Sequence, residues 1–223
     1  LEISEEALER GLSIIDSNYA GSVKRGKLSE DKAQKCRELI SGATDYGSLA
    51  DVDLVIEAVF EDPELKKEIF AKLDETCKAG AILATNTSAL DIDAIAARTG
   101  RPQDVIGLHF FSPANVMKLL EIVRADHTAD DVVATCMDLA KTINKIAVLV
   151  GVCPGFVGNR MLFERQAQAL AMVYEGVMPW DVDAALNAFG FRMGPFQMSD
   201  LAGLDIGWSK GAKTLNPIRD ALC

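Results

Sequence analysis

The chain has 223 residues, of which 49% are hydrophobic and 25% are charged, and its formal net charge is −10. This composition is typical of a globular protein, and its acidity argues against a broad nucleic-acid-binding surface. The apolar stretches are too short to cross a bilayer, and the five cysteines show no metal-ligand or disulfide spacing, so we expect reduced thiols and no metal site.

Strand and helix patterns alternate over the first two thirds of the chain. Helical spacing of apolar residues predicts a helix from Ser4 to about Ala20, and Ser29 is placed to cap a second helix that ends near Ile40. The run "DVDLVIEAVFEDP" lacks alternation, so it predicts a buried strand of a parallel sheet that is covered on both faces. Further strands are predicted at "GAILATNTS", "DVIGLHF", "VMKLLEIVR" and "KIAVLV", and further helices at 63–77, 91–98 and from a Thr128 cap to about residue 143.

The pattern becomes purely helical after Gly151. A linker, "VCPGFVGNR", leads into a predicted helix from Phe156 to about Tyr174, Pro179 opens another, and "GFRMGPFQMSDLAGLD" starts a third. Strands that alternate with helices indicate a mostly parallel α/β sheet. We therefore predict an α/β domain at residues 1–152 and an all-α domain at residues 153–223.

The first candidate site residue is Glu2. In a dinucleotide-binding βαβ unit, a carboxylate at the end of the second strand accepts hydrogen bonds from the adenosine ribose. Taken alone, Glu2 is more simply a surface acid beside a helix. The Gly-rich turn of such a unit would lie roughly 20 residues earlier, before residue 1.

Polar residues also follow two of the predicted strands. Glu61 and Lys66 lie at a strand exit and in the first turns of the next helix, where open α/β sheets bind ligands, although a solvated helix start explains them equally well. Ser88 belongs to "TNTSAL", whose hydroxyls either cap the next helix or meet a ligand, and spacing alone favours capping.

His109 and Glu121 form the sharpest candidate pair. If the strands on either side of "FFSPANVM" are antiparallel neighbours, the two side chains lie across from each other, and Glu121 is the one acid in an apolar run. A carboxylate that orients an imidazole and stabilises its charged form makes a general base. A structural ion pair is the equally weighted alternative.

Two further features are open to either interpretation. Asn159 lies at the start of the first helix after the linker, either as a first-turn polar residue or as a substrate contact at a domain junction. The basic cluster "SVKRGKLS" is either a solvated loop or a phosphate contact.

Five motifs together resemble the 3-hydroxyacyl-CoA dehydrogenase family, in its order and spacing along essentially the whole chain. They are "DLVIEAVFED", "TNTSAL", "GLHFFSPANVMKLLEIV", "PGFVGNRML" and "GFRMGPFQMSDLAGLD". The third is similar to the dehydrogenase part of multifunctional β-oxidation enzymes. The resemblance implies a Rossmann-like fold that lacks the family's first strand, Gly-rich turn and first helix.

The resemblance also implies an activity, the NAD-dependent oxidation of (S)-3-hydroxyacyl-CoA to 3-oxoacyl-CoA in fatty-acid β-oxidation. It makes His109 the catalytic base and Glu121 its orienting carboxylate, and it gives Ser88 and Asn159 contacts to the substrate. Glu2, Glu61, Lys66 and Ser88 become NAD contacts, with an acid at position 2 favouring NAD over NADP.

Two other functions stay open: a related dehydrogenase of short hydroxy or sugar acids, and an inactive fragment or non-catalytic binding relative. We expect an internal segment of a longer enzyme, which would bind NAD poorly alone, with Gly158 where many members carry an aliphatic residue. We further expect a homodimer or a place in a larger multifunctional chain, and a cytoplasmic location with a peroxisomal one as the alternative.

Overall fold

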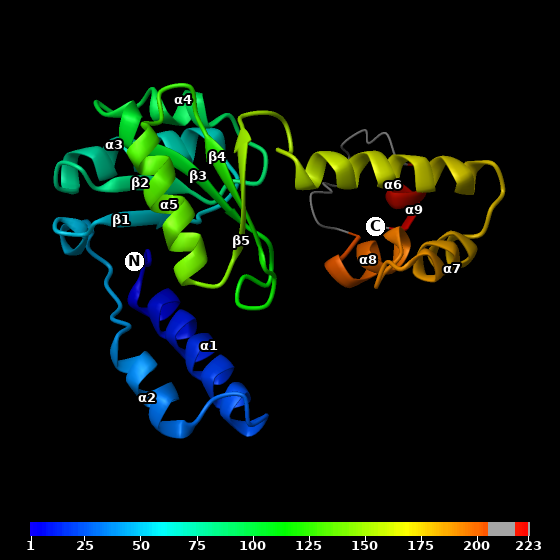
Figure 1. Ribbon diagram of the computed structural model, residues 1–223, viewed down its shortest axis with the longest axis horizontal. Helices are drawn as coiled ribbons and strands as arrows, with labels where there is room; N and C mark the ends of the chain where they lie inside the picture. Colours follow the sequence, from blue (N-terminus) through cyan, green and yellow to red (C-terminus); the bar gives the residue numbers. More distant parts are fainter. Residues whose placement is uncertain (205–216, 223) are drawn as a thin grey trace. The chain divides into compact units, whose positions relative to one another are not determined.

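The computed structural model describes residues 1–204 and 217–222. The chain forms two compact units, Leu1–Phe156 and Val157–Cys223. The first unit contains a five-stranded sheet with helices, and the described residues of the second unit contain helices and turns (Figure 1). The predicted Rossmann-like α/β fold followed by an all-α domain is confirmed.

The first unit begins with a helical hairpin, α1 (Glu5–Lys24) and α2 (Glu30–Glu38). The predicted cap of α2 is present, because the Ser29 hydroxyl accepts a hydrogen bond from the Lys32 amide. The prediction that α1 ends near Ala20 is wrong, since the helix continues for four more residues. The chain turns only at Gly26, whose φ of +67° is a left-handed conformation that glycine adopts readily.

The sheet has five strands in the spatial order of the sequence. They are β1 (Leu54–Glu57), β2 (Ile82–Thr85), β3 (Val105–Phe110), β4 (Leu119–Arg124) and β5 (Ile146–Gly151). Only β3 and β4 are antiparallel, and the other adjacent pairs are parallel, as predicted. The short helix η1 (Tyr46–Leu49) precedes β1, and the helices between the strands are α3 (Pro63–Thr76), α4 (Ile92–Ala96), η2 (Pro102–Asp104) and α5 (Asp130–Thr142).

Helices cover both faces of the central strands. One hydrophobic cluster joins Leu83 and Val105 of the sheet to Phe70 of α3, and the other joins Ile106 to Val132 of α5 (Figure 1). Alternate residues of a strand point to opposite faces, so the uninterrupted apolar runs serve both clusters. The prediction of strands buried on both faces is confirmed for β2, β3 and β4.

The outer strands are less covered than predicted. Ile56 in β1 is 41% exposed and Ile146 in β5 is 61% exposed. Within the described residues, β1 and β5 each pair with one neighbouring strand. The expectation of a fully buried strand at β1 is therefore wrong, because an apolar run cannot distinguish a central strand from an edge strand.

The predicted Thr128 cap of α5 is also wrong. Ala129 is the N-cap residue, and no side-chain hydrogen bond caps this helix. The Thr128 hydroxyl instead donates to the Val105 carbonyl at 2.7 Å and accepts from the Ala125 amide at 3.0 Å. Thr128 is buried, so its hydroxyl meets the backbone of β3 and of the turn after β4.

The second unit contains α6 (Gly158–Tyr174), α7 (Pro179–Phe189), α8 (Pro195–Ala202) and α9 (Pro217–Leu222). The first three were predicted and α9 was not. Helix α6 begins after the predicted Phe156, because that residue has a left-handed φ of +47°. The carboxylate of Asp183 accepts the backbone amides of Phe196 and Gln197, both at 3.0 Å, and thereby ties α7 to the start of α8.

Two exclusions made from the sequence can be compared with the described part of the chain. In residues 1–204 and 217–222 there is no helix of the length and apolarity that a membrane crossing requires. Cys36, Cys77, Cys136 and Cys153 carry no disulfide, while Cys223 lies outside the described residues. Asp205, the last residue of the fifth motif, also lies outside them.

Candidate active site

The antiparallel pairing of β3 with β4 places His109 directly opposite Glu121. The His109 Nδ1 atom lies 2.7 Å from Glu121 Oε2. The two side chains are 7% and 1% exposed, so water does not screen the interaction. Because Nδ1 is paired with the carboxylate, Nε2 is the nitrogen that can exchange a proton with a ligand.

Two aromatic rings flank the His109 imidazole. The ring centroid of Phe111 lies 4.4 Å from that of His109, and that of Phe156 lies at 5.8 Å. Phe156 is fully buried, and its carbonyl accepts a hydrogen bond from the Cys153 thiol. The left-handed backbone of Phe156 and its burial fix this ring against His109. The imidazole is therefore held by the Glu121 carboxylate and by two tilted aromatic contacts.

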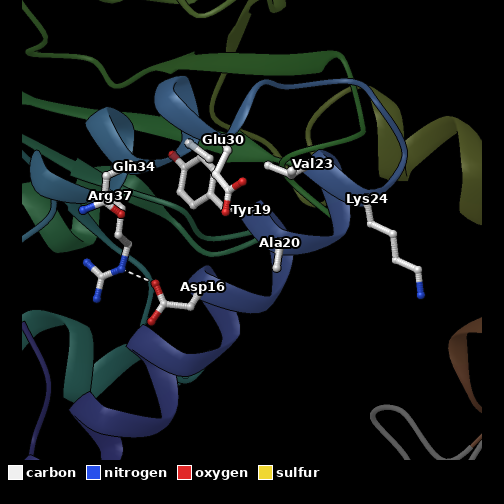
Figure 2. Close-up of a pocket in the computed structure, with 9 residues that line it drawn as sticks. Asp16, Tyr19, Ala20, Val23, Lys24, Glu30, Gln34 and Arg37 are labelled. Carbon is white, nitrogen blue, oxygen red and sulfur yellow. Dashed lines mark hydrogen bonds and ion pairs between the residues drawn. The ribbon is translucent and has the colours of Figure 1, made fainter.

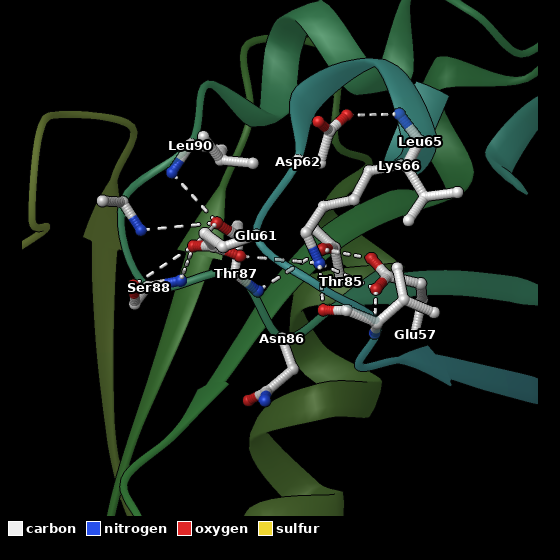
Figure 3. A network of polar contacts seen from close by, with 12 residues as sticks. Glu57, Glu61, Asp62, Leu65, Lys66, Thr85, Asn86, Thr87, Ser88 and Leu90 are labelled. Carbon is white, nitrogen blue, oxygen red and sulfur yellow. Dashed lines mark hydrogen bonds and ion pairs between the residues drawn. The ribbon is translucent and has the colours of Figure 1, made fainter. Parts of the chain in front are cut away.

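A second polar cluster lies at the carboxyl ends of β1 and β2 (Figure 3). Glu61 Oε1 accepts the Thr87 hydroxyl at 2.6 Å and the Ser88 amide at 2.7 Å. The Ser88 hydroxyl donates to the same oxygen at 3.1 Å. Behind it, the Lys66 ammonium lies 2.7 Å from Glu57 Oε1 and 3.6 Å from Glu61 Oε2.

The Glu61 carboxyl has a pKa below its ordinary value. Partial burial raises this pKa, but hydrogen bonds from Thr87 and Ser88 and the positive charge of Lys66 together outweigh it. Glu61 therefore stays ionised and accepts hydrogen bonds over the whole neutral range. This favours a role as a fixed acceptor rather than as a proton donor.

Asn86 connects this polar cluster to the strand that carries His109. Its side-chain oxygen accepts a hydrogen bond from the Phe110 backbone amide at 2.8 Å, and its backbone amide donates to the Glu57 carbonyl at 2.8 Å. Strands β1, β2 and β3 are parallel, so all of these groups lie at one edge of the sheet. Open α/β sheets bind ligands at this edge.

Two predicted site residues, Glu2 and Asn159, belong to neither of these two groups. Glu2 is exposed before α1, and its amide donates to the Ala43 carbonyl at 3.0 Å. Asn159 is half-buried in the first turn of α6 and belongs to the second unit. The structure thus groups His109 with Glu121, and Glu61 with Lys66 and Ser88.

A separate surface hollow of about 410 Å³ lies between α1 and α2 (Figure 2). An ion pair between Arg37 and Asp16 closes one side of it. Lys24, from the basic cluster singled out in the sequence, contributes to its lining. None of the candidate site residues lines this hollow.

No group of three or more His, Cys, Asp or Glu side chains in the described ranges, 1–204 and 217–222, is arranged to hold a metal ion. The polar groups at the sheet edge include the Glu61 carboxylate, the hydroxyls of Thr87 and Ser88, and the His109 imidazole paired with Glu121. That set suits proton transfer and hydrogen bonding to an organic ligand.

Comparison with known proteins decides the family. The model of the 3-hydroxyacyl-CoA dehydrogenase NAD binding domain matches residues 1–153, and that of the family's C-terminal domain matches residues 155–216. The chain belongs to the 3-hydroxyacyl-CoA dehydrogenase family. The resemblance inferred from the five motifs is thereby confirmed.

Individual 3-hydroxyacyl-CoA dehydrogenase relatives agree with this assignment. The peroxisomal bifunctional enzyme of Cavia porcellus is 49% identical over 222 residues, covering 88% of this chain and 31% of its own length. The structure of 3-hydroxybutyryl-CoA dehydrogenase from Escherichia coli has a TM-score of 0.89 and 41% identity, over 92% of this chain and 44% of that one. FadB2 of M. tuberculosis has a TM-score of 0.88 and 39% identity, over 92% of this chain and 73% of that one. The chain spans about a third of the length of the curated relatives it matches.

Two residues that contact the candidate site residues were not singled out in the sequence: Glu57 and Phe156. Glu57 could have been found, because an acid that ends the apolar run "LVIE" needs a buried partner, and Lys66 follows nine residues later. Nothing in the sequence indicates the left-handed backbone of Phe156.

Proposed function

We propose that the chain is the dehydrogenase part of a multifunctional β-oxidation enzyme. It would oxidise (S)-3-hydroxyacyl-CoA to 3-oxoacyl-CoA with NAD. The observation that carries this proposal is the buried His109–Glu121 pair at the ligand-binding edge of the sheet. Membership of the 3-hydroxyacyl-CoA dehydrogenase family supports the substrate class.

His109 acts as the general base. Its Nε2 takes the proton of the substrate 3-hydroxyl, and Glu121 accepts the Nδ1–H and stabilises the imidazolium that forms. The C3 hydrogen leaves with both bonding electrons, so the alcohol carbon becomes a ketone. Bound NAD supplies the hydride acceptor for this oxidation. The flanking rings of Phe111 and Phe156 keep the imidazole in place during the transfer.

Residues at the ends of β1 and β2 fit the hydroxyl-rich nicotinamide half of NAD. Glu61 supplies an ionised acceptor, Ser88 supplies a hydroxyl, and Phe60, 84% exposed at the same edge, supplies an apolar surface for a planar ring. Lys66 acts from behind Glu61, and Glu2 serves the adenosine ribose, where its charge favours NAD over NADP. Asn159, with Ser88, holds the substrate oxygen or thioester.

The test compares the two histidines of the chain. His109→Gln should lower the rate of NADH formation from 3-hydroxybutyryl-CoA by on the order of 1,000-fold at saturating NAD. His127→Gln is the matched control, because His127 is exposed and lies in the same unit. Equal rates in the two variants would overturn the proposal.

The alternative substrate class is tested in the same assay. A family member of the proposed type turns over 3-hydroxybutyryl-CoA in preference to free 3-hydroxybutyrate, because the thioester and the CoA moiety contribute binding energy. Faster turnover of the free acid would instead favour a dehydrogenase of short hydroxy acids.

We propose a peroxisomal location in place of the cytoplasmic one expected first. The support is that two similar curated relatives are named peroxisomal bifunctional enzymes. The two family models, which match residues 1–153 and 155–216, support a cofactor domain at residues 1–152 and a helical domain at residues 153–223. The greater length of the relatives supports a place for both in a larger chain. Fractionation of source cells tests the location, which is wrong if the protein does not sediment with a peroxisomal marker.

A further inference from the structure

Glu57 is a buried acid for which the proposed reaction has no use. It ends β1, and its side chain is 2% exposed. Its Oε1 accepts the Val59 amide at 2.6 Å and the Lys66 ammonium at 2.7 Å, and its Oε2 accepts the Thr85 hydroxyl at 2.8 Å. Three donors hold this carboxylate in one place.

The Lys66 ammonium is surrounded by protein acceptors (Figure 3). It is 1% exposed and contacts Glu57 Oε1 at 2.7 Å, the Val59 carbonyl at 3.4 Å and Glu61 Oε2 at 3.6 Å. The first two contacts are hydrogen bonds, and the third is a longer ion pair. A direct contact between this buried group and a cofactor would require one of them to be given up.

The two carboxylates share one cation unequally. Glu57 is the nearer partner and lies on the inner side, whereas Glu61 is the farther partner and has a side chain that is 40% exposed. The other oxygen of Glu61, Oε1, accepts hydrogen bonds from Thr87 and Ser88. The neighbouring Asp62 takes no part, because its carboxylate caps α3 at the Leu65 amide.

We propose that Glu57 is a positioning residue of the dehydrogenase site. It holds the Lys66 ammonium in the buried position beside β1, so that Glu61 remains hydrogen-bonded to Ser88. The inference rests on the proposed function for the role of Ser88, but its geometry does not depend on it.

Removing the charge of Glu57 has a defined electrostatic consequence. In Glu57→Gln the side chain keeps its shape, but Glu61 becomes the one carboxylate left to pair with Lys66. The attraction between Lys66 and Glu61 is then no longer opposed, so the pKa of Glu61 falls further. In Glu57→Gln/Lys66→Met the cation is gone as well, so the pKa of Glu61 rises above that of the unaltered chain.

The experiment is a titration of the 223-residue chain by NMR. The Glu61 carboxyl carbon reports its own midpoint, and the Ser88 amide proton reports the same event through its 2.7 Å hydrogen bond. We expect the midpoint of Glu61 to shift by about half a pH unit or more, downward in the single variant and upward in the double variant. The pH response of the Ser88 amide should fall by about half in Glu57→Gln, as Glu61 turns toward Lys66.

Asp74→Asn is the matched control. Asp74 also lies on α3 and forms a largely buried ion pair with Arg101 at 2.9 Å, but it has no contact with the Ser88 turn. It should lower stability and leave the Glu61 titration unchanged. A purely structural role of Glu57 would instead move Glu61 toward its ordinary pKa in every variant.

The outcomes separate cleanly. Shifts of opposite sign support the proposal, whereas an unchanged midpoint or shifts of the same sign overturn it. If Glu57→Gln fails to fold, the double variant decides alone, since a Glu61 midpoint at or below that of the unaltered chain contradicts the proposal. Because neither NAD nor substrate is present, a failure here is distinct from a failure of the proposed reaction.

Discussion

The carboxylate of Glu121 lies 2.7 Å from Nδ1 of His109, although the two side chains are only 1% and 7% exposed. A buried carboxylate without a partner is costly, so this pair is mutually dependent. The antiparallel register of β3 and β4 sets the pairing, while the surrounding pairs of the sheet are parallel. The one reversal of strand direction thus creates the acid–base pair.

Glu121→Gln tests the charge of this pair. Glutamine can still accept the Nδ1–H, but it cannot stabilise an imidazolium, so the rate of NADH formation should fall on the order of 100-fold. Nitrogen NMR of the ring should also show a mixture of tautomers for His109. The control is Glu64→Gln, on the exposed face of α3, which should leave the rate unchanged. Equal rates for the two variants would remove Glu121 from the mechanism.

Substitutions at Phe70 and Phe60 distinguish an effect on stability from an effect on cofactor binding. Phe70 is fully buried between α3 and the sheet, so Phe70→Ala should lower the free energy of unfolding by about 3–5 kcal/mol. Phe60 is 84% exposed, so Phe60→Ala should change it by about 0.5 kcal/mol at most. Urea unfolding measures both. The proposed ring contact predicts that only Phe60→Ala weakens NAD binding without loss of stability, and unaltered NAD affinity would contradict that contact.

The sequence predicted which segments form strands and where most helices start, because those depend on local features. The Ser29 cap and Pro179 at the start of α7 are such features. The central strands were also predictable from their continuous apolar runs. The pairing of His109 with Glu121 followed once an antiparallel neighbour was assumed, since the side-chain period of a strand is two residues.

Other features depend on distant parts of the chain. The exposure of Ile56 reflects the position of β1 at the sheet edge, and the hydroxyl of Thr128 is used by Val105 rather than by its own helix. The hydrogen bonds from Thr87 and Ser88 to Glu61 join residues 26 and 27 positions apart. No local propensity encodes such contacts, so the polar cluster emerges only from the fold.

The lowered pKa of Glu61 predicts a pH dependence of stability. A carboxyl whose pKa is lower in the folded chain stabilises it above its ordinary value of 4.5, and this contribution is lost as the pH falls through the lower folded value. Glu61→Gln should therefore be less stable than the unaltered chain at neutral pH, with the difference shrinking below about pH 4.5. Urea unfolding at several pH values measures it.

Ser88→Ala provides the comparison for this effect. It removes the hydroxyl donor to Glu61 and keeps the Ser88 amide, so it should retain part of the pH dependence. A stability difference between Glu61→Gln and the unaltered chain that stays constant from neutral to acidic pH would contradict the lowered pKa.

Burial determines the reactivity of the thiols. Burial raises the pKa of Cys136 to about 11 and also raises that of Cys77. The neutral thiol therefore persists at mildly alkaline pH, where a pKa two units above the ordinary 9.0 leaves about a hundredfold less thiolate. Iodoacetamide should consequently label the half-buried Cys36 and Cys153 at least about tenfold faster than Cys136 in the folded chain, and at similar rates in urea. Peptide mass spectrometry at successive times measures the four rates, and equal labelling of Cys36 and Cys136 before unfolding would show that α5 does not shield its thiol.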